Sequence, residues 1–409
     1  MTSQPTGPGD AAGFDPDRLQ RVADFTRALV DDGHLVGTDV LVARHGRVAL
    51  RSMAGMADRE RDVPVADDSL WRIYSMTKPI TSVVVMQLVD EGRLRLRDPL
   101  PGFLPAFADP RVLVGGTADN PETVPAERAI TIADLLTHTA GIGYSIMDRG
   151  PVDELHRRAG LDALAAGGTL AERIDRLATL PLLHQPGTRW SYSMATDVLG
   201  RVVELVDGRS FGEAMQARVL DPLGMVDTVF QGDDGRLDRM TSCYRFVPGA
   251  APALDEAGGA TGFRSRSWES GGGGLVSTMD DYHRFCSAMV AGGELDGRRI
   301  LGDRTVRQMM TNHLPGAGDL DDVGDPLYAP GFFIGCGFGL GFATVEDPAR
   351  GRLQATRGEA SWGGAASTVF WVDPVEGVHC IFLTQMVPSS VYASRRWDLR
   401  ALVNQALVG

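Results

Sequence analysis

The chain has 409 residues, of which 43% are hydrophobic and 23% are charged. This length and apolar content allow a large buried core and indicate two domains, or one large domain with an insertion. The 40 basic and 53 acidic residues give a formal net charge of −13, which disfavours nucleic acid and anionic membranes as partners.

The first part of the chain predicts a leader, a helix and a hairpin. Residues 1–13 show no periodic pattern, and we expect a flexible leader there. Asp15 and Pro16 provide an N-cap and a first-turn proline for an amphipathic helix. The following segment, TDVLVARHGRVALRSMAG, alternates around the dipeptide His45-Gly46 and predicts a β-hairpin.

The stretch WRIYSMTKPITSVVVMQLVDEG, residues 71–92, predicts a buried helix that begins close to Ser75. Pro79 fits only the first turn of a helix, and Gly92 ends the pattern. Residues three apart share a helix face, so Lys78 lies beside Ser75. Such a pair is more often a helix cap next to a solvated lysine. If it is buried, however, the lysine could accept the serine proton or lower the pKa of another base.

The rest of the chain is helical in the middle and returns to strands near its end. Proline- and glycine-rich segments such as GGTADNPETVPAE predict loops between the helices. The segments STVFWVD and VHCIFLTQM predict a second hairpin, and ASRRWDLRALVNQALV predicts a closing helix. We therefore expect an α/β (α+β) protein, with a discontinuous sheet domain from residues 14–74 and 270–409 and a mostly helical insertion at 75–269.

Ser210 is a second candidate nucleophile, because GRSFG fits the G-x-S-x-G elbow of α/β-hydrolases. That elbow requires a strand before the serine. The preceding segment MATDVLGRVVELVDG instead predicts a helix that ends at Gly208, and Glu213 completes a capping box with Ser210. We therefore expect Ser210 to be a helix cap. His138, in LLTHTAG, is similarly predicted to cap or pack.

No motif indicates a metal or a cofactor, and we expect neither. The histidines include no H-E-x-x-H, the GGGG run at residues 271–274 lacks the ending of a phosphate loop, and no C-x-x-C joins Cys243, Cys286, Cys336 and Cys380. The chain lacks a run of about 18 apolar residues that could span a bilayer, and its start lacks the features of a signal peptide. These patterns predict a cytoplasmic protein that does not bind membranes.

Several motifs, in this order along the chain, resemble the serine β-lactamase and penicillin-binding-protein superfamily. They are YSMTKPITSVVVMQLVDEGRLRLRDPL, LLTHTAGI, RWSYSMATDVLGRVVE, ESGGGGLVSTMDDYHRF and a late WGG. Within this superfamily the sequence most resembles the family VIII carboxylesterases and the lovastatin-type acyltransferases, which share the class C β-lactamase fold. The resemblance implies an antiparallel sheet flanked by helices, together with a mostly helical domain.

The resemblance also implies a catalytic group. The S-x-x-K motif falls on Ser75 and Lys78, and the tyrosine of the Y-x-N motif falls on Tyr192. A tyrosine in such a loop is most often half-buried packing, but beside Lys78 it could take the Ser75 proton; the residues leave open which of the two is the base. The oxyanion would be bound by the N–H group of Ser75 and, by resemblance, by that of Ala365 on an edge strand.

Two departures from the family pattern bear on the substrate. The Y-x-N asparagine is Met194 here, and the K-T-G motif is replaced by Trp362, Gly363 and Gly364. The loss of two polar groups predicts neutral acyl substrates rather than β-lactams. The two glycines allow a substrate to approach the backbone, or simply form a turn. Four aromatic residues could equally line the pocket or pack within loops: Tyr144, Tyr328, Phe332 and Phe333.

These observations predict a serine hydrolase, a carboxylesterase that cleaves neutral esters through an acyl-enzyme on Ser75. Acyl transfer to an alcohol uses the same acyl-enzyme and is the nearest alternative. A β-lactamase or D-amino peptidase comes next, and a non-catalytic ligand-binding module comes last. The expected partner is a small-molecule ester or acyl compound, and the sequence leaves the oligomeric state open.

Overall fold

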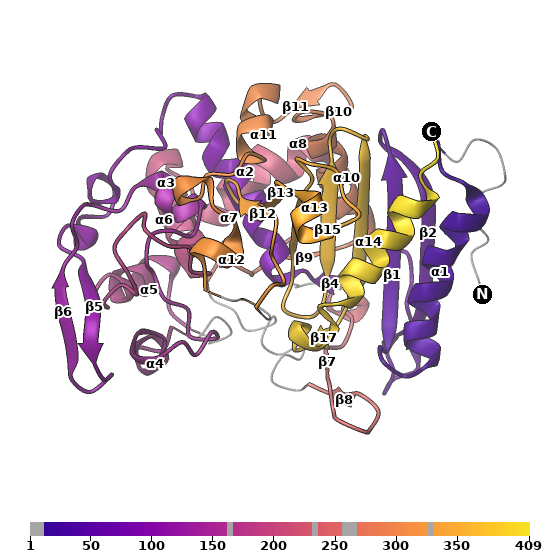
Figure 1. Ribbon diagram of the computed structural model, residues 1–409, viewed down its shortest axis with the longest axis horizontal. Coiled ribbons are helices and arrows are strands. Elements are labelled where there is room, and N and C mark those ends of the chain that lie inside the picture. Colours follow the sequence, from indigo (N-terminus) through magenta and orange to yellow (C-terminus); the bar gives the residue numbers. More distant parts are fainter. Residues whose placement is uncertain (1–11, 162–166, 231–235, 256–267, 326, 328–329) are drawn as a thin grey trace.

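A single antiparallel sheet with helices on both faces organises the molecule (Figure 1). The computed structural model describes residues 12–161, 167–230, 236–255, 268–325, 327 and 330–409. The eight strands follow the order β12-β13-β14-β15-β16-β1-β2-β3. Their bounds are Gly37–Arg44 (β1), Arg47–Asp58 (β2), Val63–Pro64 (β3), Cys336–Phe338 (β12), Ala343–Val345 (β13), Ala360–Gly363 (β14), Val369–Asp373 (β15) and Val378–Thr384 (β16).

Alternation of side chains along the strands creates a separate core on each face of the sheet. In β1, Val40 and Val42 join the core beneath α1 (Pro16–Asp31) and α14 (Arg395–Ala406), which pack on each other. Leu41 and Ala43 join the larger core on the opposite face, which α10 (Met279–Val290) and α2 (Thr77–Asp90) share. Both predicted hairpins are present, since β1 pairs with β2 and β15 with β16.

Helix α2 is the centre of the helical region, with every residue from Thr77 to Leu88 buried. It packs against α6 (Ala195–Asp207). The other α-helices of the described residues are α3 (Ile132–Leu136), α4 (Pro151–Arg158), α5 (Leu170–Leu177), α7 (Phe211–Met215), α8 (Asp221–Leu223), α11 (Asp303–Met309), α12 (Leu320–Val323) and α13 (Pro348–Gly351). Within the described residues, no helix is long and apolar enough to cross a membrane.

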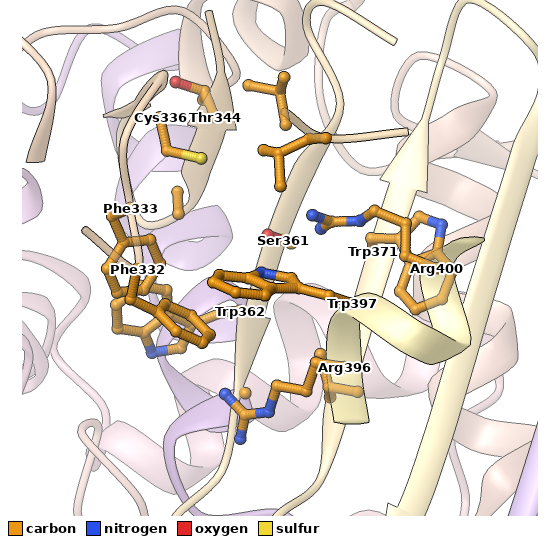
Figure 2. Close-up of a pocket in the computed structure, with 15 residues that line it drawn as sticks. Phe332, Phe333, Cys336, Thr344, Ser361, Trp362, Trp371, Arg396, Trp397 and Arg400 are labelled. Carbon is orange, nitrogen blue, oxygen red and sulfur yellow. The ribbon is translucent and has the colours of Figure 1, made fainter. Parts of the chain in front are cut away.

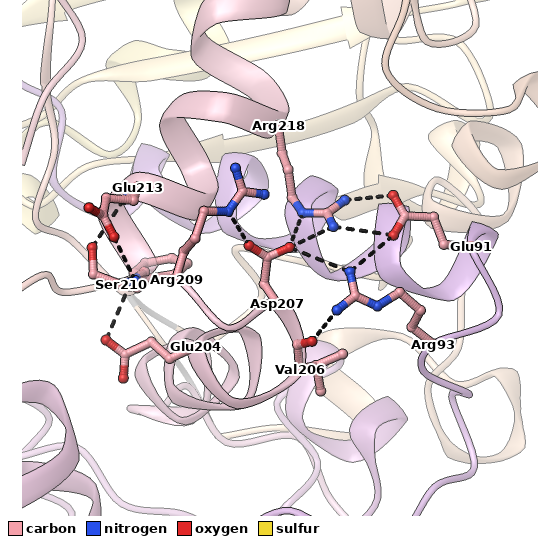
Figure 3. Close-up of polar contacts among 10 residues, drawn as sticks. Glu91, Arg93, Glu204, Val206, Asp207, Arg209, Ser210, Glu213 and Arg218 are labelled. Carbon is pink, nitrogen blue, oxygen red and sulfur yellow. Dashed lines mark hydrogen bonds and ion pairs between the residues drawn. The ribbon is translucent and has the colours of Figure 1, made fainter.

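Ion pairs hold the C-terminal ends of α2 and α6 together (Figure 3). Asp207, the last residue of α6, accepts hydrogen bonds from Arg209 at 2.5 Å and from Arg218 at 2.7 Å. Arg218 also donates to Glu91, which follows α2, at 2.6 Å. Arg93 lies 3.6 Å from the Asp207 carboxylate. The two helices that lead away from the candidate site are therefore fixed at their far ends.

The segment GGTADNPETVPAE is not simply a loop, as the sequence had predicted. Part of it forms β6 (Pro121–Pro125), which pairs with β5 (Arg111–Gly116) in a hairpin that projects from the helical region (Figure 1). Proline is tolerated at the ends of an edge strand, where its missing N–H group breaks no ladder. The remaining short strands are β4 (Trp71–Arg72), β7 (Tyr244–Arg245), β8 (Ala253–Leu254), β9 (Val276–Ser277), β10 (Glu294–Leu295), β11 (Arg298–Arg299) and β17 (Met386–Val387).

Two expectations about Ser210 and the edge of the sheet have different outcomes. Ser210 caps α7 in a capping box with Glu213, and helix α6 precedes it, so the prediction of a structural cap is confirmed.

Strand β14, which leads to Ala365, is an interior strand and not the expected edge strand, because it lies between β13 and β15. The domain boundaries at residues 74 and 269 remain a prediction.

Candidate active site

Ser75 lies at a sharp turn at the start of α2. The turn is a short 3₁₀ helix, Tyr74–Met76, that continues directly into α2. Tyr74 has a φ of 45°, in the left-handed region that side chains other than glycine rarely adopt. Because the first N–H groups of a helix have no partner within it, the Ser75 N–H group is available to a ligand.

Lys78 is buried next to Ser75, one turn along the same helix. Its Nζ atom lies 3.3 Å from Ser75 Oγ and donates a hydrogen bond to the carbonyl oxygen of Gly272 at 2.6 Å. Burial lowers the pKa of the lysine to about 7, while the charge of Asp197 acts in the opposite direction. A substantial fraction of this amine is therefore neutral at neutral pH and able to accept a proton.

Asp197 is a site residue that the sequence analysis missed. Its Oδ1 atom accepts hydrogen bonds from Ser270 Oγ at 2.7 Å and from the Gly272 N–H group at 2.9 Å. The Gly272 residue thus bonds to Asp197 through its N–H group and to Lys78 through its carbonyl. A Cβ atom at Gly272 would lie 2.7 Å from Asp197 Oδ2, which explains the glycine. An acid in the first turn of a helix is common, so the sequence gave no distinct signal for it.

Tyr192 meets Lys78 and Trp362 just before the start of α6. Lys78 Nζ lies 4.5 Å from the centre of the Tyr192 ring. The indole Nε1 of Trp362 donates a hydrogen bond to the Tyr192 hydroxyl at 3.4 Å. The structure therefore brings together Ser75, Lys78, Tyr192 and Trp362, four residues singled out from motifs far apart in the sequence.

Hydrogen bonds on either side fix the backbone around Tyr192. Arg149, which is paired with buried Asp153 at 3.1 Å, donates to the Tyr192 carbonyl oxygen at 3.0 Å. The hydroxyl of Ser193 and Nδ1 of His138 lie 2.9 Å apart. Burial lowers the pKa of His138 well below its ordinary value, so this imidazole is neutral and packs against the tyrosine, as the sequence predicted.

Ala365 lies in the turn after β14, where it is exposed. A Cβ atom at Gly364 would lie 2.6 Å from the carbonyl oxygen of Ile73, so the end of β14 packs closely on the backbone before Ser75. In the described part of the chain, the Ala365 N–H group donates to no acceptor. Two N–H groups, those of Ser75 and Ala365, are therefore available on neighbouring turns.

Aromatic rings form the wall of this site. The Tyr144 ring centre lies 5.4 Å from Lys78 Nζ. Phe333 stacks on Trp362, with 6.4 Å between ring centres; Figure 2 shows these two rings. Met194, at the asparagine position of the resembled motif, is 1% exposed and is part of the hydrophobic core. Tyr328 lies outside the described residues. Among the described residues, no group of three or more His, Cys, Asp or Glu side chains is placed to hold a metal.

Comparison with known proteins decides the family. A family model described as Beta-lactamase matches residues 22–405. The chain belongs to the beta-lactamase family. Among curated members, esterase EstB of Burkholderia gladioli is 33% identical over 398 residues, which cover 91% of this chain and 94% of EstB. The lovastatin esterase of Penicillium rubens is 31% identical over 368 residues, which cover 85% of this chain and 88% of that enzyme.

A solved structure of the beta-lactamase fold agrees with this assignment. EstCE1, described as a hydrolase with promiscuous acyltransferase activity, is 28% identical, with a TM-score of 0.78, and the match covers 95% of this chain and 98% of EstCE1. These similarities confirm the expected fold class and the resemblance to family VIII and lovastatin-type enzymes. They also confirm the expected enzyme class, that of a serine esterase in this superfamily with acyl transfer as the alternative.

Proposed function

We propose that this beta-lactamase family member is a carboxylesterase that hydrolyses neutral small-molecule esters through an acyl-enzyme on Ser75. One observation carries the assignment of the nucleophile. Lys78 Nζ lies 3.3 Å from Ser75 Oγ, in surroundings whose desolvation lowers the lysine pKa to about 7. A serine hydroxyl is a weak nucleophile until a base within hydrogen-bond reach removes its proton.

In the proposed reaction, Ser75 Oγ attacks the ester carbonyl carbon. Its proton passes to neutral Lys78 or to Tyr192, with Lys78 and Tyr192 acting as one unit. The N–H groups of Ser75 and Ala365 stabilise the oxyanion of the tetrahedral intermediate. The same proton then goes to the departing alkoxide, which leaves as an alcohol. A water molecule, deprotonated by the same base, attacks the acyl carbon. The bond from this carbon to Ser75 Oγ breaks, the proton returns from the base to Oγ, and the carboxylic acid leaves.

The site favours uncharged substrates. Trp362 stands where β-lactam enzymes of the resembled superfamily carry a lysine, and its indole is 7% exposed against the Tyr192 ring. An aromatic wall offers no partner for a substrate carboxylate. The proposal includes a small-molecule ester as the substrate and the cytoplasm as the location of the protein.

Acyl transfer is the second candidate, because EstCE1 combines hydrolysis with acyltransferase activity. Both reactions share the acyl-enzyme and differ in whether water or an alcohol attacks it. Product analysis with and without an added alcohol separates them. A new ester formed in proportion to the alcohol would assign acyl transfer, whereas free acid alone would assign hydrolysis.

The test of the nucleophile compares two serine variants. A fluorophosphonate should add to the wild-type enzyme in a 1:1 ratio by intact mass, and Ser75→Ala should abolish both the adduct and ester turnover. The matched control, Ser210→Ala, should keep full activity and lose about 1 kcal/mol of stability with its helix cap. Activity that survives in Ser75→Ala but disappears in Ser210→Ala would overturn the assignment. Penicillins turned over as well as short-chain aryl esters would overturn the substrate class.

A further inference from the structure

A pocket lies on the α14 side of the sheet, beside the last residues of β14 (Figure 2). Strands β13, β14 and β15 form its floor, and α14 covers it. The space inside it that the centres of water-sized molecules can reach is about 50 Å³. On the same measure, a cavity that holds one water has about 10–15 Å³, so this pocket has room for a larger group. Five of its lining side chains are aromatic: Phe332, Phe333, Trp362, Trp371 and Trp397.

A row of rings connects this pocket with the candidate active site. Trp397 stacks on Phe332 with 4.6 Å between ring centres and 21° between ring planes. Phe332 meets Phe333 edge-on at 4.9 Å, and Phe333 lies nearly parallel to Trp362. Because Trp362 also donates to the Tyr192 hydroxyl, one indole is both a wall of the pocket and a wall of the active site. The pocket and the candidate active site therefore share one side chain, that of Trp362.

Two guanidinium groups face the pocket, and both are held by neighbouring protein groups. Arg400 pairs with the buried carboxylate of Glu359 at 2.7 Å and lies over the ring of Trp371, 5.5 Å from its centre. Arg396 donates to the carbonyl oxygen of Thr368 at 3.2 Å. Planar guanidinium groups and aromatic rings attract the face of another ring more than a saturated group of similar size.

We propose that this pocket binds an uncharged aromatic ring of the substrate, in either the acyl or the alcohol part of the ester. The proposal rests on the proposed esterase function, because it places the ring relative to Ser75. Trp397 is the wall that can move, since it is 38% exposed and has solvent on its outer side. Turning this indole outward widens the pocket without disturbing the sheet beneath it.

The test compares matched phenyl and cyclohexyl esters, which are similar in size but differ in aromatic character. One series varies the acyl group of p-nitrophenyl esters, and the other series, or arm, varies the alcohol of acetate esters. The kcat/KM of each ester is divided by the rate constant for hydrolysis of the same ester by hydroxide, which removes differences in intrinsic reactivity. The wild-type enzyme should favour the phenyl member of one arm by about 5-fold in kcat/KM, the size expected for one aromatic contact. The arm with the preference identifies which part of the ester enters the pocket. Equal rates in both arms would overturn the proposal.

Two variants of pocket residues test whether the preference for phenyl over cyclohexyl esters arises in this pocket. Leu353→Trp, at a partly exposed lining position, should fill the pocket and remove the phenyl preference, while ethyl acetate, an ester without a ring, is still hydrolysed. Trp397→Ala should reduce the preference by removing one ring. The matched control is Phe246→Ala, which removes an equally exposed ring (38%) outside the pocket and should leave the preference unchanged. A preference unchanged in both pocket variants would assign it elsewhere and overturn the proposal.

The proposed esterase function and the proposed aromatic pocket can be refuted independently of each other. If the wild-type enzyme hydrolyses no ester, acetate included, the proposed function is wrong. Calorimetric titration with benzyl alcohol and cyclohexylmethanol then judges the pocket by itself. Tighter binding of benzyl alcohol that Leu353→Trp abolishes would still support an aromatic site, and equal binding would overturn it.

Discussion

Asp197 should set the pH at which the enzyme becomes active. Its carboxylate and the Lys78 amine bind opposite ends of Gly272, at 2.9 Å and 2.6 Å. As a general scale, two unit charges about 6 Å apart in a medium of effective dielectric constant about 20 interact by about 3 kcal/mol, which corresponds to about 2 pKa units. The substitution Asp197→Asn removes the charge and keeps an oxygen that can accept the Gly272 N–H hydrogen bond.

The expected result is a shift of the acidic limb of the pH profile. Lys78 accepts a proton only as the neutral amine, so kcat/KM should rise with pH through the lysine pKa of about 7. The Asp197 charge raises that pKa, and its removal lowers it. The limb of Asp197→Asn should therefore move to lower pH, by about 2 units.

The assay is kcat/KM for one short-chain aryl ester, measured between about pH 5 and about pH 9. Ser270→Ala is the matched control, because it removes a hydrogen bond to the same carboxylate without changing its charge, and its limb should stay in place. A limb that moves upward in Asp197→Asn, or does not move, would refute the idea that Lys78 works as a neutral amine under the influence of this carboxylate.

The remaining predictions concern the proton path and acid stability. Tyr192→Phe keeps the ring and removes the hydroxyl, so kcat should fall about 10²–10⁴-fold, and a near-normal kcat would leave lysine as the base. Lys78→Ala should be at least as damaging, and the double variant no worse than the worse single one, whereas additive losses would show that the two residues act independently. His379 is buried, and its Nε2 lies 2.8 Å from His283 Nδ1; burial lowers its pKa to about 3. Because the unfolded histidine binds a proton below about pH 6.5 and the folded one does not, the free energy of unfolding should fall between about pH 6.5 and about pH 3, by up to about 1.4 kcal/mol per unit. Urea titrations across this range should show a shallower dependence for His379→Asn, and parallel curves would contradict this.

Local signals predicted most of the elements that hold the candidate site. The turn chemistry at His45-Gly46, the position of Pro79 and the stop at Gly92 each follow from backbone geometry within a few residues. The capping box at Ser210 is equally local, which is why the sequence alone argues against a nucleophile elbow at the G-x-S-x-G motif.

The features of the site and the sheet that the sequence did not predict depend on contacts between segments that are distant along the chain. The Gly272 carbonyl that binds Lys78 is 194 residues away along the chain, and no periodicity carries such information. The pairing of β14 on both sides, which makes it an interior strand, depends on β13, a strand of three residues without a clear alternating pattern. The pocket under α14 could not be predicted for the same reason, since its rings come from four segments: the loop before β12, strands β14 and β15, and helix α14.

The pairing of β1 with β16 has a consequence for biosynthesis. Thr38 lies opposite Thr384, so the middle of the sheet closes only after Thr384 has left the ribosome. The oxyanion donor proposed at Ala365 belongs to the same late segment, whereas Ser75 and Lys78 emerge early. The nascent polypeptide therefore carries its proposed nucleophile and the neighbouring lysine without the proposed oxyanion donor until Ala365 has been synthesised. Contacts of such long sequence separation also predict slow folding.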